Sequence, residues 1–579
     1  MRRNAFLAGL LLSTASLSTT SPVAAQSAFE LTAPAPHGFD RAQAQTDTEA
    51  YLAKLIGIDT QNPPGNELRA AKYLESVLSG VSGMETQVIE MTPGRANFIA
   101  HLHATHPSKK AVLIMDHMDV VGVDLTKWQT LPFELTVRDG YLYGRGAIDD
   151  KGMLAASMTA LLCLAKQRDA LDRDIILLAT AAEESGGEGI RWILEHEFKR
   201  IESADFALNE GGRIRAEHGR IPLVNIQTTE KIPYNILVTA SGPSGHASIP
   251  LPDNALAALA RAVVSVHEWN TPVRLNETTR SYFSGLARLE RDPAMKRAME
   301  TLASSRDSVA TDRAAEVVSL EPRYNALLRT GVSLTLLNGG IRSNVIPSQG
   351  TANLNVRVVP GEDIREIMTE INRVAGERQV IFSLMGESRS SPPISPTTTA
   401  LYAALAEAAG VMAPDAVVTP LMSTGGTDAA ALREKGIPTY GILPLPMAVE
   451  DELRMHGDNE RVPIAALGWG AEYLIGFCSS SRVGELGRSL AINGRTDGDG
   501  PTGFLAKNVE CRGTCWVGVR SQQRRRSGSE PAFGIGRNAV DFVYGILARA
   551  IPGAGRTGQW PPFGLPRQCS HDSAASRGH

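Results

Sequence analysis

The sequence predicts an α/β fold, in which a mostly parallel sheet is flanked by helices and a smaller α+β domain is inserted into it. Three short, continuous apolar runs have the pattern of buried strands: 111–115, 175–180 and 206–208. A helical pattern at 151–167 separates the first two runs, and strands that alternate with helices are typical of a parallel sheet. From about residue 232 the order changes to strand, helix, two strands and helix, which predicts the inserted domain.

The individual elements follow from hydrophobic periodicity and turn residues. Before the first strand, "TEAYLAKLIGI" (48–58) has helical spacing, and a second helix is expected after the Pro-Pro-Gly turn in "QNPPGNELRAAKYLESVL" (61–78). In the insert, "YNILVTASGPSGHAS" (234–248) begins with the alternation of a strand, and a charged, helix-favouring stretch occupies about 286–321. The α/β pattern resumes at "TTTALYAALAEAAG" (397–410).

After the first 45 residues, these patterns divide the chain into four segments. The main α/β domain covers 46–231 and 389–478, and the inserted domain covers 232–388. After residue 478 the composition shifts to Gly, Ser, Arg and Pro, so we expect 479–579 to be largely disordered, with a basic interaction tail as the alternative.

The first 25 residues predict a signal peptide. Two arginines precede an apolar run at 5–12, and the small residues Val23 and Ala25 suit cleavage after Ala25. The run is too short to span a bilayer, and an uncleaved anchor is the alternative. We therefore expect an exported protein, periplasmic or secreted, with no membrane attachment in its mature form.

Size and charge limit the classes of partner. A chain of 579 residues can form two or three domains with full cores. The formal net charge of −4 at pH 7 gives no reason to expect nucleic acid as a partner.

Acidic and histidine side chains follow all three predicted strands of the main domain. The first strand leads into His117 and Asp119, the second ends at Glu183-Glu184, and the third ends at Glu210. The glycine-rich "YGRGAIDDKG" delivers Asp149 and Asp150 at the start of a helix. Because ligands bind beyond the carboxyl ends of strands in open α/β sheets, these side chains are expected to converge on one edge.

Each of these residues alone has a simpler interpretation. A histidine at a strand end is usually solvated, and Asp150 has the position of a helix N-cap. Together, imidazole and carboxylate ligands without thiolate suit zinc, with cobalt or manganese as alternatives. A carboxylate-rich set with few histidines fits two divalent metal ions that share a bridging carboxylate.

These motifs resemble the di-zinc metallopeptidases that include glutamate carboxypeptidase, succinyl-diaminopimelate desuccinylase, acetylornithine deacetylase and the aminoacylases. The resemblance covers about 46–477. "HMD" is similar to the family's His-x-Asp, which implies that His117 is a ligand and Asp119 its orienting partner. "GRGAIDDKG" implies that Asp149 is the bridging ligand and that the peptide bond after it is cis.

The resemblance also divides the glutamate pair. It implies that Glu183 is the general base, which takes a proton from a water molecule activated by the metals, and that Glu184 is a ligand. "RMHGDNE" (454–460) resembles the motif of the family's late histidine ligand. The implied ligand sets are His117, Asp149 and Glu210 for one metal, and Asp149, Glu184 and His456 for the other.

The insert and the second half of the main domain carry the implied substrate residues. "SGPSGHASIP" resembles the lid motif whose histidine polarises the substrate carbonyl, commonly in the partner subunit, so it assigns His246 to catalysis and implies a homodimer through the insert. The other matching motifs imply substrate binding by Asn344, Arg357, Gly425, Gly426 and Thr427. The stretch at 286–321 resembles the enlarged lid of the vacuolar and secreted N-acyl-amino-acid branch.

The expected function is that of an exported metal-dependent exopeptidase. It would hydrolyse an amide bond next to an amino acid with a free carboxylate, as a carboxypeptidase or dipeptidase. An aminoacylase that removes an acyl group from an amino acid is the alternative, because both reactions use the same chemistry and the same carboxylate contact. A catalytically silent metal-binding protein is a more remote alternative, since a structural site has no need of an unliganded Glu183 beside the metals.

Overall fold

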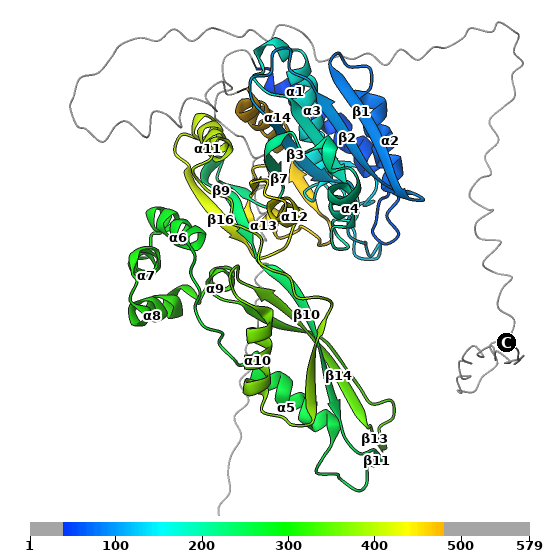
Figure 1. The fold of residues 1–579 in the computed structure, drawn as a ribbon, viewed down its shortest axis with the longest axis vertical. Helices are drawn as coiled ribbons and strands as arrows, with labels where there is room; N and C mark the ends of the chain where they lie inside the picture. The colour runs from blue at the N-terminus through cyan, green and yellow to red at the C-terminus, as the bar shows by residue number, and fades with distance from the viewer. Residues whose placement is uncertain (1–38, 480–579) are drawn as a thin grey trace, which may run out of the picture. The chain divides into compact units, whose positions relative to one another are not determined.

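The computed structural model describes residues 39–479, which form a large sheet, an inserted smaller sheet and their helices (Figure 1). The predicted signal peptide, 1–25, and all but the first residue of the predicted tail, 479–579, lie outside the described residues. Within 39–479, no helix has both the length and the apolar character that crossing a membrane requires.

The large sheet has nine strands in the order β1-β2-β6-β3-β7-β17-β9-β16, with β8 paired to β9. Its centre is parallel: β6, β3, β7 and β17 run in one direction, whereas β1, β2 and β8 pair antiparallel. The predicted α/β fold with a mostly parallel sheet is thus confirmed at the centre. The strands are β1 Met84–Thr92, β2 Arg95–Leu102, β3 Ala111–His117, β6 Ile175–Thr180, β7 Ala204–Asn209, β8 Arg213–Glu217, β9 Arg220–Glu230, β16 Val417–Ser423 and β17 Thr439–Gly441.

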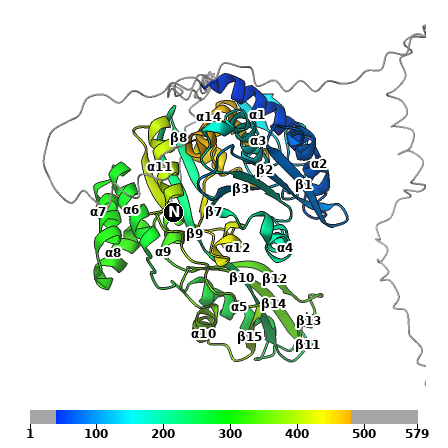
Figure 2. The same ribbon diagram turned by 45° about the horizontal axis from the view of Figure 1, so that its top comes forward.

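Helices cover both faces of this sheet, and each face has its own apolar core (Figure 2). One core is formed with α1 Arg41–Ile56, α2 Glu67–Leu78, α3 Lys151–Ala165, α11 Ala400–Met412 and α14 Ile464–Cys478. The opposite core is formed with α4 Glu188–His196 and α12 Ala429–Glu434. The central strands β3 and β6 are buried along their whole length, which explains their continuous apolar runs.

The inserted domain contains an antiparallel four-stranded sheet in the order β12-β14-β10-β15. Two helices, α5 Ala255–His267 and α10 Ile364–Ala375, cover one face of it (Figure 1). A two-stranded ribbon, β11 with β13, extends from it. The strands are β10 Ile232–Ser241, β11 Gly245–His246, β12 Gly331–Gly339, β13 Val345–Ile346, β14 Gln349–Val358 and β15 Val380–Met385.

The charged stretch in the insert forms four helices, of which α6 packs directly on the large sheet and α7 packs on α6. The helices are α6 Glu277–Leu289, α7 Pro293–Ser304, α8 Ser308–Val318 and α9 Pro322–Leu328. Phe283 and Leu286 of α6 share a core with Val417 of β16, and an added Cβ on Gly285 would meet Thr419 at 2.0 Å. The apolar face of α6 therefore covers an edge of the main domain, and the resemblance of this stretch to an enlarged lid stays a prediction.

The remaining elements are short. A three-stranded sheet in the order β18-β5-β4 is built from β4 Thr136–Arg138, β5 Tyr141–Tyr143 and β18 Arg461–Pro463. One further helical turn is α13 Val449–Glu452, and two 3-10 turns occur at Arg168–Ala170 and Phe198–Arg200.

Candidate metal centre

Three neighbouring parallel strands deliver the acidic and histidine side chains to one edge of the large sheet. His117 is the last residue of β3, Glu210 directly follows β7, and Glu183 and Glu184 follow β6 within four residues. Asp149 precedes α3, which begins at Lys151. The predicted convergence therefore occurs at the carboxyl ends of the strands, where open α/β sheets bind ligands.

Asp149 lies between the two histidines. Its Oδ1 is 2.8 Å from Nε2 of His117, and its Oδ2 is 2.9 Å from Nε2 of His456. The Asp149–Asp150 peptide bond is cis, as the resemblance implied. Because each carboxylate oxygen faces a different imidazole, Asp149 has the position of a group that could bridge two cations.

The other predicted ligands surround this carboxylate. Ligand atoms of His117, Asp149 and Glu184 lie within 4.8 Å of one another, as do ligand atoms of His117, Glu183 and Glu210. Oε1 of Glu184 is 3.2 Å from Nε2 of His456. The structure thus brings together all five predicted metal ligands and the predicted base. The division of the ligands between two metals stays a prediction.

Burial has the largest effect on the carboxyl groups of the site, and neighbouring negative charge adds to it. Burial raises the pKa of Glu210 to about 8 and raises the pKa of Glu183 well above its ordinary value. Burial alone would lower the pKa of His117, but the carboxylates of Asp119 and Asp149 raise it well above its ordinary value. The contact with Asp149 raises the pKa of His456 to about 10.

A cation would offset this negative charge. Within residues 39–479, no Lys or Arg forms an ion pair with Glu183, Glu184 or Glu210. Oε1 of Glu184 is buried, and among the described residues its close polar contact is Nε2 of His456 at 3.2 Å. Buried carboxylates without a compensating charge are costly, and oxygen and imidazole donors without thiolate suit zinc, cobalt or manganese. The residues present therefore fit two divalent metal ions.

Asp119 fixes the backbone of the glutamate pair. Its Oδ1 accepts the backbone N–H of Glu183 at 3.1 Å, and its Oδ2 accepts that of Glu184 at 3.2 Å. The side chain of Asn62 donates to the same carboxylate at 2.9 Å. Nδ1 of His117 lies 3.0 Å from the backbone oxygen of Asp119 but 3.6 Å from its carboxylate. Asp119 therefore orients His117 chiefly through its backbone oxygen, because its side chain is engaged by the glutamate amides.

A buried ion pair that was not predicted supports Asp149. Oε1 of Glu460 accepts the backbone N–H groups of Ile148 and Asp149 at 2.7 and 3.1 Å. Its Oε2 accepts from Nη1 of Arg145 at 2.5 Å, and Nη2 of Arg145 donates to the backbone oxygen of Gly457 at 2.9 Å. Arg145 and Glu460 thereby join the loop of Asp149 to the loop of His456. Both residues lie in the quoted motifs, "GRGAIDDKG" and "RMHGDNE", but no local pattern shows that they pair.

Two non-glycine residues at the site adopt left-handed backbone conformations. Ala182, directly before the glutamate pair, has φ 60°, and His456 has φ 61°. This conformation costs a residue with a Cβ roughly 1–2 kcal/mol and is found at functional sites that the surrounding structure holds in place. The hydrogen bonds from the backbone of Glu183 and Glu184 to Asp119 provide that support.

The glycine-rich loop lies at the junction with the insert. Thr427 donates through its hydroxyl and its backbone N–H to the carboxylate of Glu230, at 2.8 and 3.0 Å. Gly426 is close to Pro233, whose ring carbons would be 3.5 Å from an added Cβ. The next residue, Asp428, was not singled out by sequence: its Oδ2 accepts from the hydroxyl of Thr180 at 2.8 Å, and burial raises its pKa to about 7.

Arg357 lies on the insert sheet close to this junction. It pairs with Pro233 in the register of β10 with β14, and its Nε donates to Oδ1 of Asn355 at 2.9 Å. No carboxylate forms an ion pair with Arg357 in the described part of the chain. A half-buried guanidinium without an acidic partner is suited to a carboxylate ligand.

His246 and Asn344 lie together, apart from these residues. Strand pairing places His246 opposite Val345, and the backbone N–H of Ala247 donates to the backbone oxygen of Asn344 at 3.0 Å. His246 is exposed, and its Nδ1 contacts the hydroxyl of Ser248 at 2.7 Å. Neither residue has a described contact with the predicted metal ligands.

The fold and this site define a class: metal-dependent hydrolases that act on amide bonds. Residues 113–480 match the model of Peptidase family M20/M25/M40. The chain belongs to this family, which confirms the resemblance inferred from the motifs. It is accordingly a metal-dependent hydrolase of amide bonds.

Individual relatives agree with this assignment. The chain is 27% identical over 406 residues to the N-fatty-acyl-amino acid synthase/hydrolase PM20D1 of Homo sapiens, covering 68% of this chain and 78% of the relative. It is 30% identical over 364 residues to a probable carboxypeptidase S-like 2 of Dictyostelium discoideum, covering 62% and 69%. Its fold is similar to that of the M20 family metallo-carboxypeptidase Sso-CP2 from Sulfolobus solfataricus, with a TM-score of 0.56, 20% identity, and coverage of 75% and 98%.

Proposed function

We propose that the protein hydrolyses the amide bond of an amino acid whose α-carboxylate is free. The observation that carries this proposal is the placement of Asp149 between His117 and His456, with Glu183 and Glu210 close to His117. The resemblance assigns the ligand roles to the other side chains and leaves Glu183 as the base. A purely structural metal site has no use for a carboxylate beyond the ligand set that the resemblance assigns. Family membership supports the same reaction class.

Two bound divalent cations would supply the Lewis acid that polarises the carbonyl and acidifies water. His117, Asp149 and Glu210 would hold one cation, and Asp149, Glu184 and His456 the other. Glu183 takes the proton from the attacking water and delivers it to the leaving amine.

The residues around the junction bind the substrate. Arg357 would receive the α-carboxylate, and Asn355 restrains the guanidinium through its contact at Nε. The loop of Gly425, Gly426 and Thr427 lies close to Arg357. Thr427 is hydrogen-bonded to Glu230, and Arg357 is paired with Pro233, which follows Glu230 by three residues.

A dipeptide or peptide C-terminus is the first candidate substrate, which makes the protein a carboxypeptidase or dipeptidase. An N-acyl amino acid is the second candidate. The relatives support it, because they include an N-fatty-acyl-amino acid synthase/hydrolase and Aminoacylase-1 of Mus musculus, which is 26% identical over 388 residues. Both candidates present the same carboxylate to Arg357 and the same amide to Glu183.

We also propose that the active form is a homodimer in which His246 and Asn344 serve the partner's site. Within one chain, the register of β10 with β14 places Arg357 at one end of β14, whereas β11 and β13 adjoin the other end. This separation is about 26 Å along the strand, which is too far for Arg357 and His246 of one chain to contact the same small substrate. The edge strand β12 offers a dimer contact, because Leu334, Leu336 and Leu337 are exposed on it.

The N-terminal signal pattern supports export as a further part of the proposal. The mature chain would begin at Gln26, in the periplasm or outside the cell.

The test is a panel of substrates that share one C-terminal residue. It pairs dipeptides with N-acyl amino acids and includes a C-terminally amidated analogue of each. Cleavage that is lost with a chelator and with the amidated analogue would support the proposal, and the preferred half of the panel would choose between peptidase and deacylase. Equal cleavage of the substrates with a free carboxylate and of their amidated analogues would show that the protein does not recognise the carboxylate.

A further inference from the structure

A second group of metal-binding side chains lies at the other end of strand β6. Asp174 directly precedes β6, whereas Glu183 and Glu184 follow its carboxyl end. His101 lies near the end of β2, opposite Ile176 in the antiparallel pairing of β2 with β6, and His103 follows β2. The six residues of β6 separate the two groups by about 20 Å, so His101, His103 and Asp174 are distinct from the candidate metal centre.

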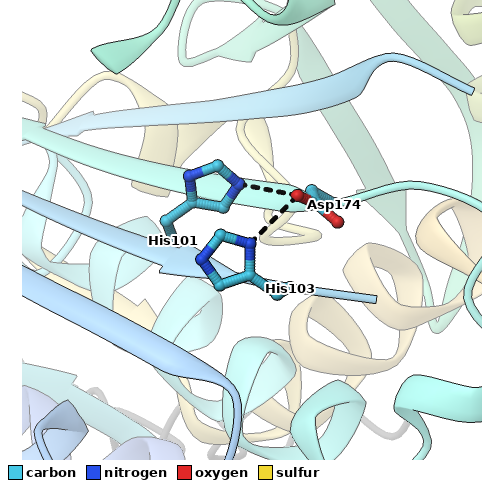
Figure 3. Close-up of side chains that lie close together, drawn as sticks. All are labelled: His101, His103 and Asp174. Carbon is cyan, nitrogen blue, oxygen red and sulfur yellow. Dashed lines mark hydrogen bonds and ion pairs between the residues drawn. The ribbon is translucent and has the colours of Figure 1, made fainter. Parts of the chain in front are cut away.

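The three side chains converge on one oxygen atom (Figure 3). Nε2 of His101 is 3.0 Å and Nδ1 of His103 is 3.1 Å from Oδ2 of Asp174. The two rings are stacked, with centroids 4.1 Å apart and an interplanar angle of 25°. One potential ligand atom from each residue lies within 4.8 Å of the others.

These separations suit a small divalent cation. Zinc bonds to nitrogen and oxygen are about 2.0–2.1 Å long, so two ligands of a tetrahedral ion are about 3.3 Å apart. The observed contacts to Asp174 are only slightly shorter, and a cation would spread them by a few tenths of an ångström. Two imidazoles and one carboxylate also form a ligand set that binds first-row transition metals in preference to calcium or magnesium.

The surroundings orient the three ligands. Oδ1 of Asp174 accepts the backbone N–H of Ala104 at 2.9 Å, which leaves Oδ2 directed at the histidines. Nε2 of His103 is buried without a hydrogen-bond partner, and a carboxylate oxygen of Glu85 lies 3.5 Å away. Carboxylates beside the second nitrogen of a histidine are typical of metal sites.

Among residues 39–479, no Lys or Arg forms an ion pair with Asp174. Its ion-pair contacts are with the two histidines, whereas the neighbouring Asp172 is the carboxylate that pairs with Lys109 and Arg173. All three ligand side chains are partly exposed, so an ion can enter from solvent.

We propose that His101, His103 and Asp174 form an additional site for a first-row divalent transition metal such as zinc, which ties the end of β2 to the start of β6. The site stabilises the fold and takes no part in hydrolysis. The same three side chains could instead share protons in hydrogen bonds, and the metal content of variants distinguishes the two arrangements.

The experiment counts zinc in the full chain after chelation and re-equilibration with a small excess of zinc, by gel filtration and mass spectrometry of the metal. The variant is His101→Gln/His103→Gln. The matched control is His106→Gln, because His106 is exposed and lies on the same segment. We expect the double variant to bind one equivalent fewer than the wild type and the control, with metal-dependent turnover kept within about twofold.

The melting temperature gives a second reading. Zinc should raise it less in the double variant than in the wild type, because one stabilising ligand is lost. Equal zinc content in variant and wild type would overturn the proposal. If the double variant does not fold, Asp174→Asn serves instead, since its amide oxygen can still accept the backbone N–H of Ala104. A loss of zinc affinity at this site of about tenfold or more would support the proposal. A zinc affinity within twofold of wild type would overturn it.

Discussion

At the scale of single residues, the adjacent carboxylates of Glu183 and Glu184 are explained by what lies around them. Two neighbouring glutamates at a strand end repel each other unless a cation or a proton is shared between them. Asp119 holds both of their backbone N–H groups, so the two side chains are presented from a fixed turn. The side chain of Glu183 then lies close to His117 and Glu210, and that of Glu184 lies beside His456.

Arg357 supplies a prediction about specificity. Arg357→Ala should lower kcat/KM about 10- to 100-fold for substrates with a free carboxylate, because a hydrogen bond to a charged group contributes roughly 1.5–3 kcal/mol. The same variant should leave the slow turnover of the amidated analogue unchanged. Steady-state kinetics on the two substrates measures the difference.

Arg373→Ala is the control for this prediction. Arg373 is exposed on α10 and pairs with Glu370 of the same helix, 2.8 Å away. An equal loss of kcat/KM for acid and amide substrates in Arg357→Ala would show that Arg357 supports the fold and does not read the carboxylate.

At the scale of elements, the sequence predicts what is local and misses what pairs across the chain. The strand ends at His117, Glu183 and Glu210 could be predicted, because buried parallel strands have continuous apolar runs followed by polar residues. The pairing of Arg145 with Glu460 joins residues 315 positions apart, and neither has a periodic pattern around it. Only the folded chain shows that these two residues support Asp149.

The same limit applies to the helices of the insert. Helix α6 could be predicted from its composition, but its partner could not. Helical periodicity shows that one face of α6 is apolar, but it does not identify the surface that this face covers. The close approach of Gly285 to Thr419 on β16 decides the partner, and this contact spans 134 residues of sequence.

The buried ion pair gives a prediction about stability. Glu460→Gln should lower the free energy of unfolding by about 3–5 kcal/mol, because it leaves Arg145 as a buried charge without its partner. It should also weaken metal binding about 10- to 100-fold, since Glu460 holds the backbone of Asp149. Urea unfolding and metal titration measure the two effects. Asp458→Asn, on an exposed residue of the same loop, should change neither.

At the scale of the whole molecule, buried carboxyl groups make the metal-free protein sensitive to pH. Burial raises the pKa of Glu210 to about 8 and those of Asp116 and Asp428 to about 7, whereas unfolded carboxyl groups titrate near 4. Between pH 5 and 7 the folded state therefore binds more protons than the unfolded chain, and the free energy of unfolding should fall as pH rises. The slope is about 1.4 kcal/mol per pH unit for each such group.

Urea unfolding with a chelator at pH 5, 6 and 7 tests this slope. Added zinc should reverse it, because metal binding requires the ionised carboxylates and strengthens as pH rises. A metal-free protein that becomes more stable from pH 5 to 7 would contradict the electrostatic account of the site.

The proposed dimer predicts complementation between inactive chains. Glu183→Gln and His246→Ala should each be inactive alone, but a refolded mixture should recover about a quarter of wild-type activity, because half of randomly formed dimers contain one intact site of two. His267→Ala, on α5, is the control and should stay active alone. Failure of the mixture to recover activity while dimers form would place His246 outside the partner's site.

The most direct test of the central claim is metal reconstitution of the chelator-treated wild type and Glu183→Gln in parallel, with bound metal and turnover measured on the same samples. Both proteins should regain the same two equivalents of metal at the candidate metal centre. To count only these ions, both proteins also carry His101→Gln/His103→Gln. Turnover should return only in the wild type and stay about 10²–10⁴-fold lower in the variant, as for the loss of a general base. Turnover in the metal-free wild type, or in Glu183→Gln within about tenfold of wild type, would contradict the account.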